Sequence, residues 1–186
     1  MLPLEFYLRN NVLTIARDLI GTHLFTQIEN EPVTGGMIIE TEAYAGVEDR
    51  ASHAFNGRRT KRNEVMYWKG GAVYVYLCYG IHPLLNVVTN ESGIPHAVLV
   101  RAIRPTKGVE IIRERRKGKL PLAAGPGMVS QALGITIREN GQSFLSSSIW
   151  IEARNSLFDD NSIKTGPRIG VDYAKEHALL PWRFYV

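Results

Sequence analysis

The chain has 186 residues, of which 45% are hydrophobic and 22% are charged, a composition typical of an ordinary globular protein. This length predicts one domain over residues 1–186, and it excludes disorder, collagen-like repeats and coiled coil as descriptions of the whole chain. The formal net charge of +4 permits a polyanionic partner without requiring one. No apolar run of about 18 residues and no signal-peptide pattern is found, so we expect a cytoplasmic protein without a membrane partner.

The first predicted element is an amphipathic helix near the N-terminus. Asn10 or Asn11 is placed to cap it, its apolar residues recur at helical spacing, and Gly21 is predicted to end it. Residues 22–36 predict a strand followed by a polar turn. Residues 37–44 alternate in polarity and predict a second strand.

Three strand-like runs then follow in quick succession, at 72–79, 84–90 and 96–105. The short breaks between them favour an antiparallel meander. The remaining predicted elements are a helix at 109–117, a short helix between Gly125-Pro126-Gly127 and Gly134, and strands at 149–154 and 183–186. Together these elements predict an α+β fold with a curved antiparallel sheet and flanking helices.

The acidic strand is the first candidate for chemistry. Alternation places Glu40, Glu42 and Tyr44 on one face together with Ile38, and the residues between them on the other face. Burial or close approach of two carboxylates raises the pKa of at least one and makes it a usable general base. The alternative is a solvated strand face that ends in a tyrosine.

Tyrosines gather beside this strand and in the next predicted one. Tyr74 is expected to be a core residue, whereas Tyr79 adjoins a predicted turn and is expected to project. Exposed aromatic rings form sequence-tolerant platforms for nucleic-acid bases, but strand aromatics also fill cores, and both interpretations stay open here. Cys78, in the same apolar run, is expected to be buried and unreactive.

Basic residues form two clusters. The first, in the loop after the acidic strand, contains Arg58, Arg59, Lys61 and Arg62 and suits contacts to phosphates. The second, between Arg113 and Lys119, is expected to be a solvated face. The sequence lacks CxxC and HxxxH spacings and nucleotide-binding glycine loops, so neither a metal nor a cofactor is expected. An enzyme built on this chain would rely on carboxylate chemistry.

Several of these segments resemble a known family. IIETEAYAGVEDRASHAFNGRRTKRNEVMY (38–67), VYVYLCYGIHPLLNVV (73–88) and AVLVRAIRP (97–105) are similar to the alkyladenine (3-methyladenine) DNA glycosylases of the mammalian alkylation-repair type. The resemblance extends through GPG, GPRIGVDYA and the closing PWRFYV, so it covers nearly the whole chain. The histidine nine residues after the tyrosine of ETEAY makes the pattern highly specific.

The resemblance implies catalytic roles at two matching positions. Glu42 would activate the water that attacks C1′ of the sugar, and Arg101 would help to hold that water. Glu40 does not match the family's base and is expected either to be structural or to support the residues that contact the substrate. Sugar hydrolases that invert configuration use the same logic, in which one carboxylate activates water.

The resemblance also implies how the damaged base is held. Tyr44 and Tyr76 would sandwich a base that has left the duplex, and His53 would contact its edge. Asn86 would disfavour normal guanine through its exocyclic amino group. Tyr79 would fill the gap left in the duplex.

The implied protein is a monomeric, monofunctional DNA glycosylase of base excision repair, acting on double-stranded DNA. It would remove alkylated or deaminated purines (3-methyladenine and 7-methylguanine, with hypoxanthine and ethenoadenine as further candidates) and leave an abasic site. The short N-terminal region is typical of a bacterial, nucleoid-associated member. Met128-Val129 replaces the family's Lys-Leu, so no phosphate contact is assigned there, and relatives continue for several residues beyond the motif that ends at Val186.

Two rival functions are compatible with the same residues. A non-catalytic nucleic-acid-binding module would use the tyrosines and the basic loop to bind without releasing any base. A small-nucleoside hydrolase would act on free nucleosides and would depend little on salt or on duplex structure.

Overall fold

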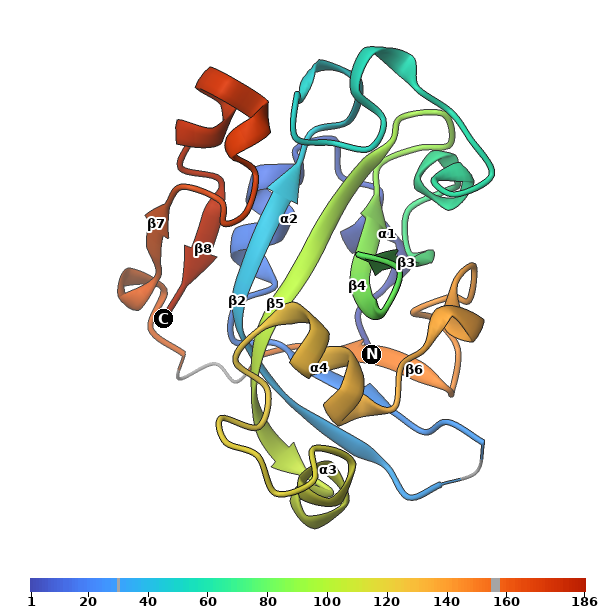
Figure 1. Ribbon diagram of the computed structural model, residues 1–186, viewed down its shortest axis with the longest axis vertical. Coiled ribbons are helices and arrows are strands. Elements are labelled where there is room, and N and C mark those ends of the chain that lie inside the picture. The colour runs from blue at the N-terminus through green and yellow to red at the C-terminus, as the bar shows by residue number, and fades with distance from the viewer. Residues whose placement is uncertain (30, 155–157) are drawn as a thin grey trace.

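The structure, a computed structural model, describes residues 1–29, 31–154 and 158–186. Its centre is one antiparallel sheet with the strand order β3-β4-β5-β2-β1-β6, in which β8 also pairs with β2 and β7 with β8. The strands are β1 (His23–Thr26), β2 (Thr34–Tyr44), β3 (Val73–Cys78), β4 (His82–Thr89), β5 (His96–Lys107), β6 (Ile149–Glu152), β7 (Lys164–Gly166) and β8 (Arg183–Tyr185). The sheet is twisted and curled (Figure 1), and the predicted α+β fold is confirmed.

Helices cover the sheet at several places (Figure 1). They are α1 (Leu4–Tyr7), α2 (Val12–Asp18), α3 (Val109–Arg115) and α4 (Pro126–Leu133). Asn11 caps α2, because its side chain accepts hydrogen bonds from the Leu13 and Thr14 amides. Pro126 opens α4, and Gly134 closes it in the left-handed conformation (φ 69°). These caps confirm the predicted starts of both helices, whereas α1 and β7 were not predicted.

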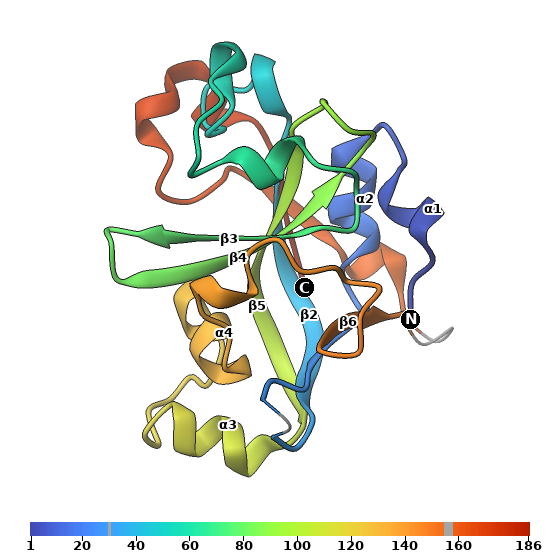
Figure 2. The ribbon, with the colours of Figure 1, turned by 90° about the vertical axis from the view of Figure 1, so that its right-hand side faces the viewer.

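Strands β3, β4 and β5 form the predicted antiparallel meander. The hairpin of β3 and β4 projects from the body of the molecule, with α4 on one side and loops on the other (Figure 2). At its tip Tyr79 and Gly80 both have positive φ (52° and 75°), and the Tyr79 side chain is 92% exposed. The prediction that Tyr79 projects is therefore confirmed.

The pairing of β2 with β5 contains two compensating irregularities. The register shifts between Ile38 and Glu40, which leaves Ile39 without a partner, and shifts back between Glu40 and Thr41, which skips Arg101 on β5. Such bulges re-aim side chains. Ile38 consequently lies in the main core, whereas Glu40 contacts Arg101 on the other side of the strand. The prediction that Ile38 shares a face with the two glutamates is wrong, because alternation fails at the bulge.

Burial corrects two further expectations and confirms one. Cys78 is partly exposed and lines a cavity, so it is not buried. In the second basic cluster, Arg116 is buried and Arg115 donates to Thr34 Oγ1 and the Ala132 carbonyl, so this cluster is not simply a solvated face. Tyr74 is a core residue, as expected. No helix in the described ranges is long and apolar enough to cross a membrane.

Candidate active site

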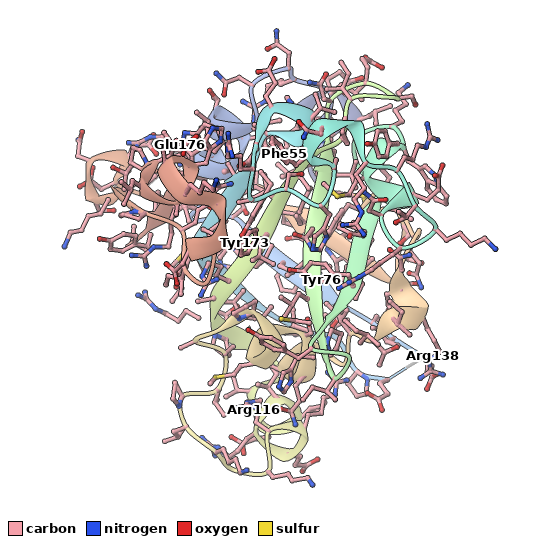
Figure 3. All side chains as sticks on the ribbon, turned by 45° about the horizontal axis from the view of Figure 1, so that its top comes forward. Phe55, Tyr76, Arg116, Arg138, Tyr173 and Glu176 are labelled. Atoms are coloured by element: carbon pink, nitrogen blue, oxygen red, sulfur yellow. The ribbon has the colours of Figure 1, made fainter. Side chains whose placement is uncertain are left out.

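A cavity of about 380 Å³ opens between the β3–β4 hairpin, one face of β5, the loop after β2 and the segment that follows β7. This volume lies in the range of small-molecule sites. The structure brings together here most of the residues that the family resemblance singled out, namely Tyr44, His53, Tyr76, Tyr79, Asn86 and Arg101. Tyr76 of β3 and Tyr173 of the 3₁₀ segment Asp172–Leu179, both labelled in Figure 3, line the same cavity.

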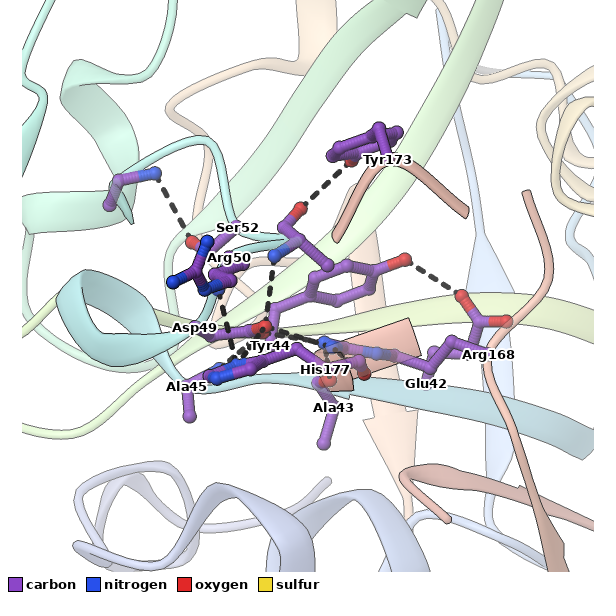
Figure 4. Close-up of polar contacts among 12 residues, drawn as sticks. Glu42, Ala43, Tyr44, Ala45, Asp49, Arg50, Ser52, Arg168, Tyr173 and His177 are labelled. Carbon is purple, nitrogen blue, oxygen red and sulfur yellow. Dashed lines mark hydrogen bonds and ion pairs between the residues drawn. The ribbon is translucent and has the colours of Figure 1, made fainter. Parts of the chain in front are cut away.

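Glu42 lies directly behind the cavity wall, with no exposed side-chain surface. The Tyr44 hydroxyl donates to its Oε2 at 2.8 Å (Figure 4), and the Ile169 amide donates to its Oε1 at 2.8 Å. The Arg101 guanidinium lies 3.3 Å from the same Oε1. Tyr44, Ile169 and Arg101 all line the cavity, so the residues that hold the carboxylate also form the wall of the site.

Burial raises the pKa of Glu42 above its ordinary value, and it does so against Arg101, the Ile169 amide, the Tyr44 hydroxyl and Arg168, which all act to lower it. A carboxylate with a raised pKa is a better proton acceptor than an exposed one. Burial and the nearby Glu42 charge raise the pKa of Tyr44 well above its usual value. Tyr44 therefore stays protonated and keeps donating to Glu42.

The ring of Tyr44 is supported from behind by a buried cation. Arg168 lies 4.8 Å from the centre of the Tyr44 ring and 5.0 Å from that of Trp182. Arg168 also forms a two-pronged ion pair with Asp49 at 2.5 and 2.8 Å, and both side chains are fully buried. Figure 4 shows this network next to the Tyr44–Glu42 contact. Because Arg168 has no exposed side-chain surface, it holds Tyr44 from the buried side and leaves the ring available to the cavity.

Tyr76 forms an opposite part of the wall within an aromatic group. Its ring stacks on Tyr74 at 5.6 Å, and His53 meets it edge-on at 4.5 Å. His53 Nδ1 lies 2.9 Å from the Tyr74 hydroxyl. Burial, with the Arg62 and Arg58 charges, lowers the pKa of His53 to about 4. His53 is therefore neutral at ordinary pH and can both donate and accept a hydrogen bond.

Asn86 lines the cavity, and two hydrogen bonds hold its amide in place. It is buried, and its Nδ2 donates to the carbonyls of Tyr74 and Leu84, each at 3.2 Å. With both N–H groups used, its remaining polar group is the acceptor Oδ1.

The first basic cluster divides into residues with different partners. Arg62 lines the cavity, donates to the Leu77 carbonyl at 2.9 Å and lies 5.6 Å from the Tyr76 ring. Arg59 pairs with Glu64 and packs on Tyr67. Two further residues of the cluster are exposed and have no salt-bridge partner within the described ranges, and these are Arg58 and Lys61.

Sequence reasoning assigned no roles to Asp49, Arg168, Ile169 and Tyr173. The motif GPRIGVDYA contains three of them, but spacing alone cannot show that they meet β2 and the loop after it, more than 100 positions earlier. Among the residues that the structure describes, no three His, Cys, Asp or Glu side chains are grouped so that they could hold a metal ion.

Comparison with known proteins decides the family. The model of the methylpurine-DNA glycosylase family matches residues 5–186. The chain belongs to this family. It is therefore an enzyme, a DNA glycosylase that hydrolyses N-glycosyl bonds, and the resemblance found in its sequence is confirmed.

Individual relatives of this glycosylase agree with the family match. A protein of Chlamydia felis is 50% identical over 99% of this chain and 95% of the relative. A protein of Bacillus subtilis is 43% identical over 100% of this chain and 92% of the relative. Each carries the name "Putative 3-methyladenine DNA glycosylase". The matches run over nearly the full length of both partners, so the similarity covers the whole site.

Proposed function

We propose that this glycosylase removes alkylated or deaminated purines, 3-methyladenine and 7-methylguanine among them, from double-stranded DNA by means of a water that Glu42 activates. The observation that carries the proposal is a fully buried carboxylate of raised pKa behind a cavity walled by tyrosines. A solvated strand face, the alternative for this glutamate, would leave it exposed with an ordinary pKa.

The damaged base is held between the Tyr44 and Tyr76 rings. The negative faces of these rings favour electron-poor and cationic purines, which is the chemical property that alkylation confers. His53 contributes a neutral edge that can donate or accept a hydrogen bond. Asn86, whose amide is held by two backbone carbonyls, disfavours normal guanine through its exocyclic amino group, and 7-methylguanine is accepted because its cationic ring stacks more strongly on the tyrosines.

The base enters the cavity after its nucleotide has rotated out of the duplex. Rotation costs a few kcal/mol, and less for a damaged base, which supplies part of the selectivity. The exposed Tyr79 at the tip of the projecting hairpin is the side chain that takes the vacated place in the base stack. Arg58 and Lys61 contact phosphates beside the lesion.

The glycosidic bond is then broken by hydrolysis. Glu42 takes a proton from the attacking water as the bond to C1′ forms, and its negative charge stabilises the positive charge that develops on the sugar. Arg101 and the Ile169 amide keep the carboxylate oriented. No lysine lines the cavity within the described residues, so no Schiff base forms and the strand stays intact. The products are a free base and an abasic site, as base excision repair requires.

The substrate is chromosomal DNA, so we place the enzyme on the nucleoid in the cytoplasm of a bacterium. We propose that it acts as a monomer, because a single chain supplies the cavity, the carboxylate behind it and the basic residues near it.

The test is to incubate the purified chain with methylated duplex DNA and identify the released bases by mass spectrometry. Release of methylpurines, with strands that break only after alkali, is the expected result. Unmethylated duplex and free methylated nucleosides are the controls. Tight binding without release would support a binding module, and release from free nucleosides alone would support a nucleoside hydrolase.

A further inference from the structure

Glu42 is the first member of a row of alternating charges. Arg101 Nη1 lies 3.3 Å from Glu42 Oε1, and Arg101 Nε donates to Glu40 Oε1 at 3.1 Å. Arg183 Nη1 donates to the same Glu40 oxygen, also at 3.1 Å. The row, which we call the charge relay, is therefore Glu42–Arg101–Glu40–Arg183.

The relay exists because of the two bulges in the sheet. The ladder skips Ile39 and Arg101, and this brings Glu40 opposite Ala102 with the Arg101 side chain between the two carboxylates. On the other edge of β2, strand β8 places Arg183 opposite Glu42 and Tyr185 opposite Glu40. Arg183 is fixed there, because its Nε donates to the Pro167 carbonyl at 2.8 Å and its guanidinium packs on Tyr185.

Burial makes these charges interact strongly. The side chains of Arg101, Glu40 and Arg183 are only 12%, 20% and 22% exposed, and that of Glu42 is not exposed at all. Solvent and salt screen such partly buried charges far less than surface pairs. One cation is thus shared between two carboxylates, and one oxygen of Glu40 is shared between two cations.

We propose that Glu40 and Arg183 are positioning residues for the catalytic carboxylate: Glu40 competes with Glu42 for Arg101, and Arg183 limits this competition by engaging Glu40 from the other side. The proposal rests on the function of Glu42 given above. In this arrangement Arg183 acts through Glu40, and Glu40 acts through Arg101. Neither residue lines the cavity, and both are joined to it only through Arg101, which does line it, so we expect both to act on Glu42 and not on the substrate.

Other groups also face Glu42 and must stay constant in a test. Tyr44 donates to it from its own strand, Arg168 acts from the segment after β7, and Arg101 acts from β5. Tyr76 and Tyr173 approach from β3 and from the 3₁₀ segment, since the Glu42 charge contributes to raising the pKa of both. Substitution of Glu40 or Arg183 replaces none of these five side chains, and Arg101 is the one whose pairing is expected to change.

The relay predicts opposite effects for its two outer members. Glu40→Gln removes the competing carboxylate, so Arg101 is left to Glu42 and the pKa of Glu42 falls, by about 0.5–1 unit. Arg183→Met frees Glu40 to draw Arg101 more strongly, so the pKa of Glu42 rises. In the Glu40→Gln background the Arg183→Met substitution has little further effect, because the residue through which it acts is absent.

The experiment is a carbon-13 NMR titration of the Glu42 carboxyl carbon in protein labelled at glutamate, with the signal assigned by its loss in Glu42→Gln. This readout does not depend on activity, so it tests the relay even if the proposed function fails. Arg183→Lys, which keeps the charge, is the matched control and should shift the pKa of Glu42 less than Arg183→Met. Opposite shifts in the two single variants, with the double variant showing the same shift as Glu40→Gln alone, support the relay. Shifts that simply add, or no shift in Glu40→Gln, overturn it.

The pH dependence of the reaction tests whether the relay affects catalysis. The acid limb of single-turnover base release should move to lower pH in Glu40→Gln and to higher pH in Arg183→Met, while the plateau rate changes little. Urea melts of each variant report whether the fold is kept. Shifts in the NMR titration without matching shifts in the acid limb would refute Glu42 as the base while leaving the relay intact.

Discussion

Replacement of Arg168 by methionine should test whether the buried ion pair supports the site. In the native protein Arg168 bonds to both oxygens of Asp49 and to the carbonyls of Ala43 and His177. Asp49 also accepts from the Ala45 and Ala51 amides. Arg168→Met therefore leaves a carboxylate that is fully buried and has lost its only close guanidinium partner among the described residues.

The expected cost follows from this geometry. Removing one partner of a buried ion pair typically costs about 3–5 kcal/mol, because the other charge stays buried without compensation. For a protein of this size each kcal/mol lowers Tm by about 2–4 °C, so Arg168→Met should lower Tm by roughly 6–20 °C. The Tyr44 ring also loses the cation behind it, so KM for duplex substrate should rise in the fraction that stays folded.

Urea unfolding followed by circular dichroism measures the free energy of unfolding directly. Arg113→Met is the matched control, because Arg113 pairs with Glu110 on the surface, with side chains 53% and 76% exposed. This control should change the free energy of unfolding by at most about 0.5 kcal/mol. If Arg168→Met lowers the free energy of unfolding by less than about 1 kcal/mol, the argument that the substitution leaves the Asp49 charge buried without a partner is refuted.

Three other outcomes are expected. Tyr79→Ala should leave the free energy of unfolding nearly unchanged, since the side chain is exposed. It should lower kcat/KM on duplex DNA by about 5- to 150-fold through lost stacking. Equal activity of this variant on duplex DNA would contradict the proposal that Tyr79 takes the vacated place in the base stack. The rate of purine release should decline as the pH falls through the raised pKa of Glu42, because Glu42 must be ionised to accept a proton from water. His53→Phe should leave this acid decline in place, since the pKa of His53 is already about 4. A rate that stays constant from pH 7 to pH 4.5 would refute the role of Glu42. Arg58→Ala and Lys61→Ala should each reduce the slope of log affinity against log salt by about 0.9 if each contacts one phosphate, while Arg113→Ala should not, and an unchanged slope would exclude phosphate contacts at these positions.

Much of the fold could be predicted because its signals are local. The Asn11 cap, the Pro126 start and the Gly134 end of α4 depend on a few neighbouring residues, and the β3–β5 meander follows from short breaks between apolar runs. The bulge at Ile39 could not be predicted in the same way. A bulge is a property of how two strands pair, and it moved Ile38 to the core although local alternation placed it beside the glutamates.

The site residues also divide into those that local sequence predicts and those that depend on the tertiary fold. Glu42, Tyr44, His53 and Tyr76 lie in motifs that can be recognised in sequence, and the structure gathers them around one cavity. The exposure of Cys78 was missed because its apolar neighbours suggested a core strand, whereas the strand there already belongs to a projecting hairpin.

The residues that hold the Glu42 carboxylate and support its neighbour Tyr44 include some much further along the chain. The Ile169 amide reaches Glu42 across 127 positions, and Arg168 reaches Asp49 across 119. Only the tertiary fold shows these contacts, although the motif that contains them was recognised.

The central claim is that Glu42 activates the water. Its most direct test is single-turnover release of a methylpurine from duplex DNA by Glu42→Gln, with duplex affinity measured in parallel. We predict that release falls by about 10²–10⁴-fold, the usual contribution of a general base, while Kd changes by less than about threefold. Release by Glu42→Gln within tenfold of the unsubstituted enzyme would contradict the account.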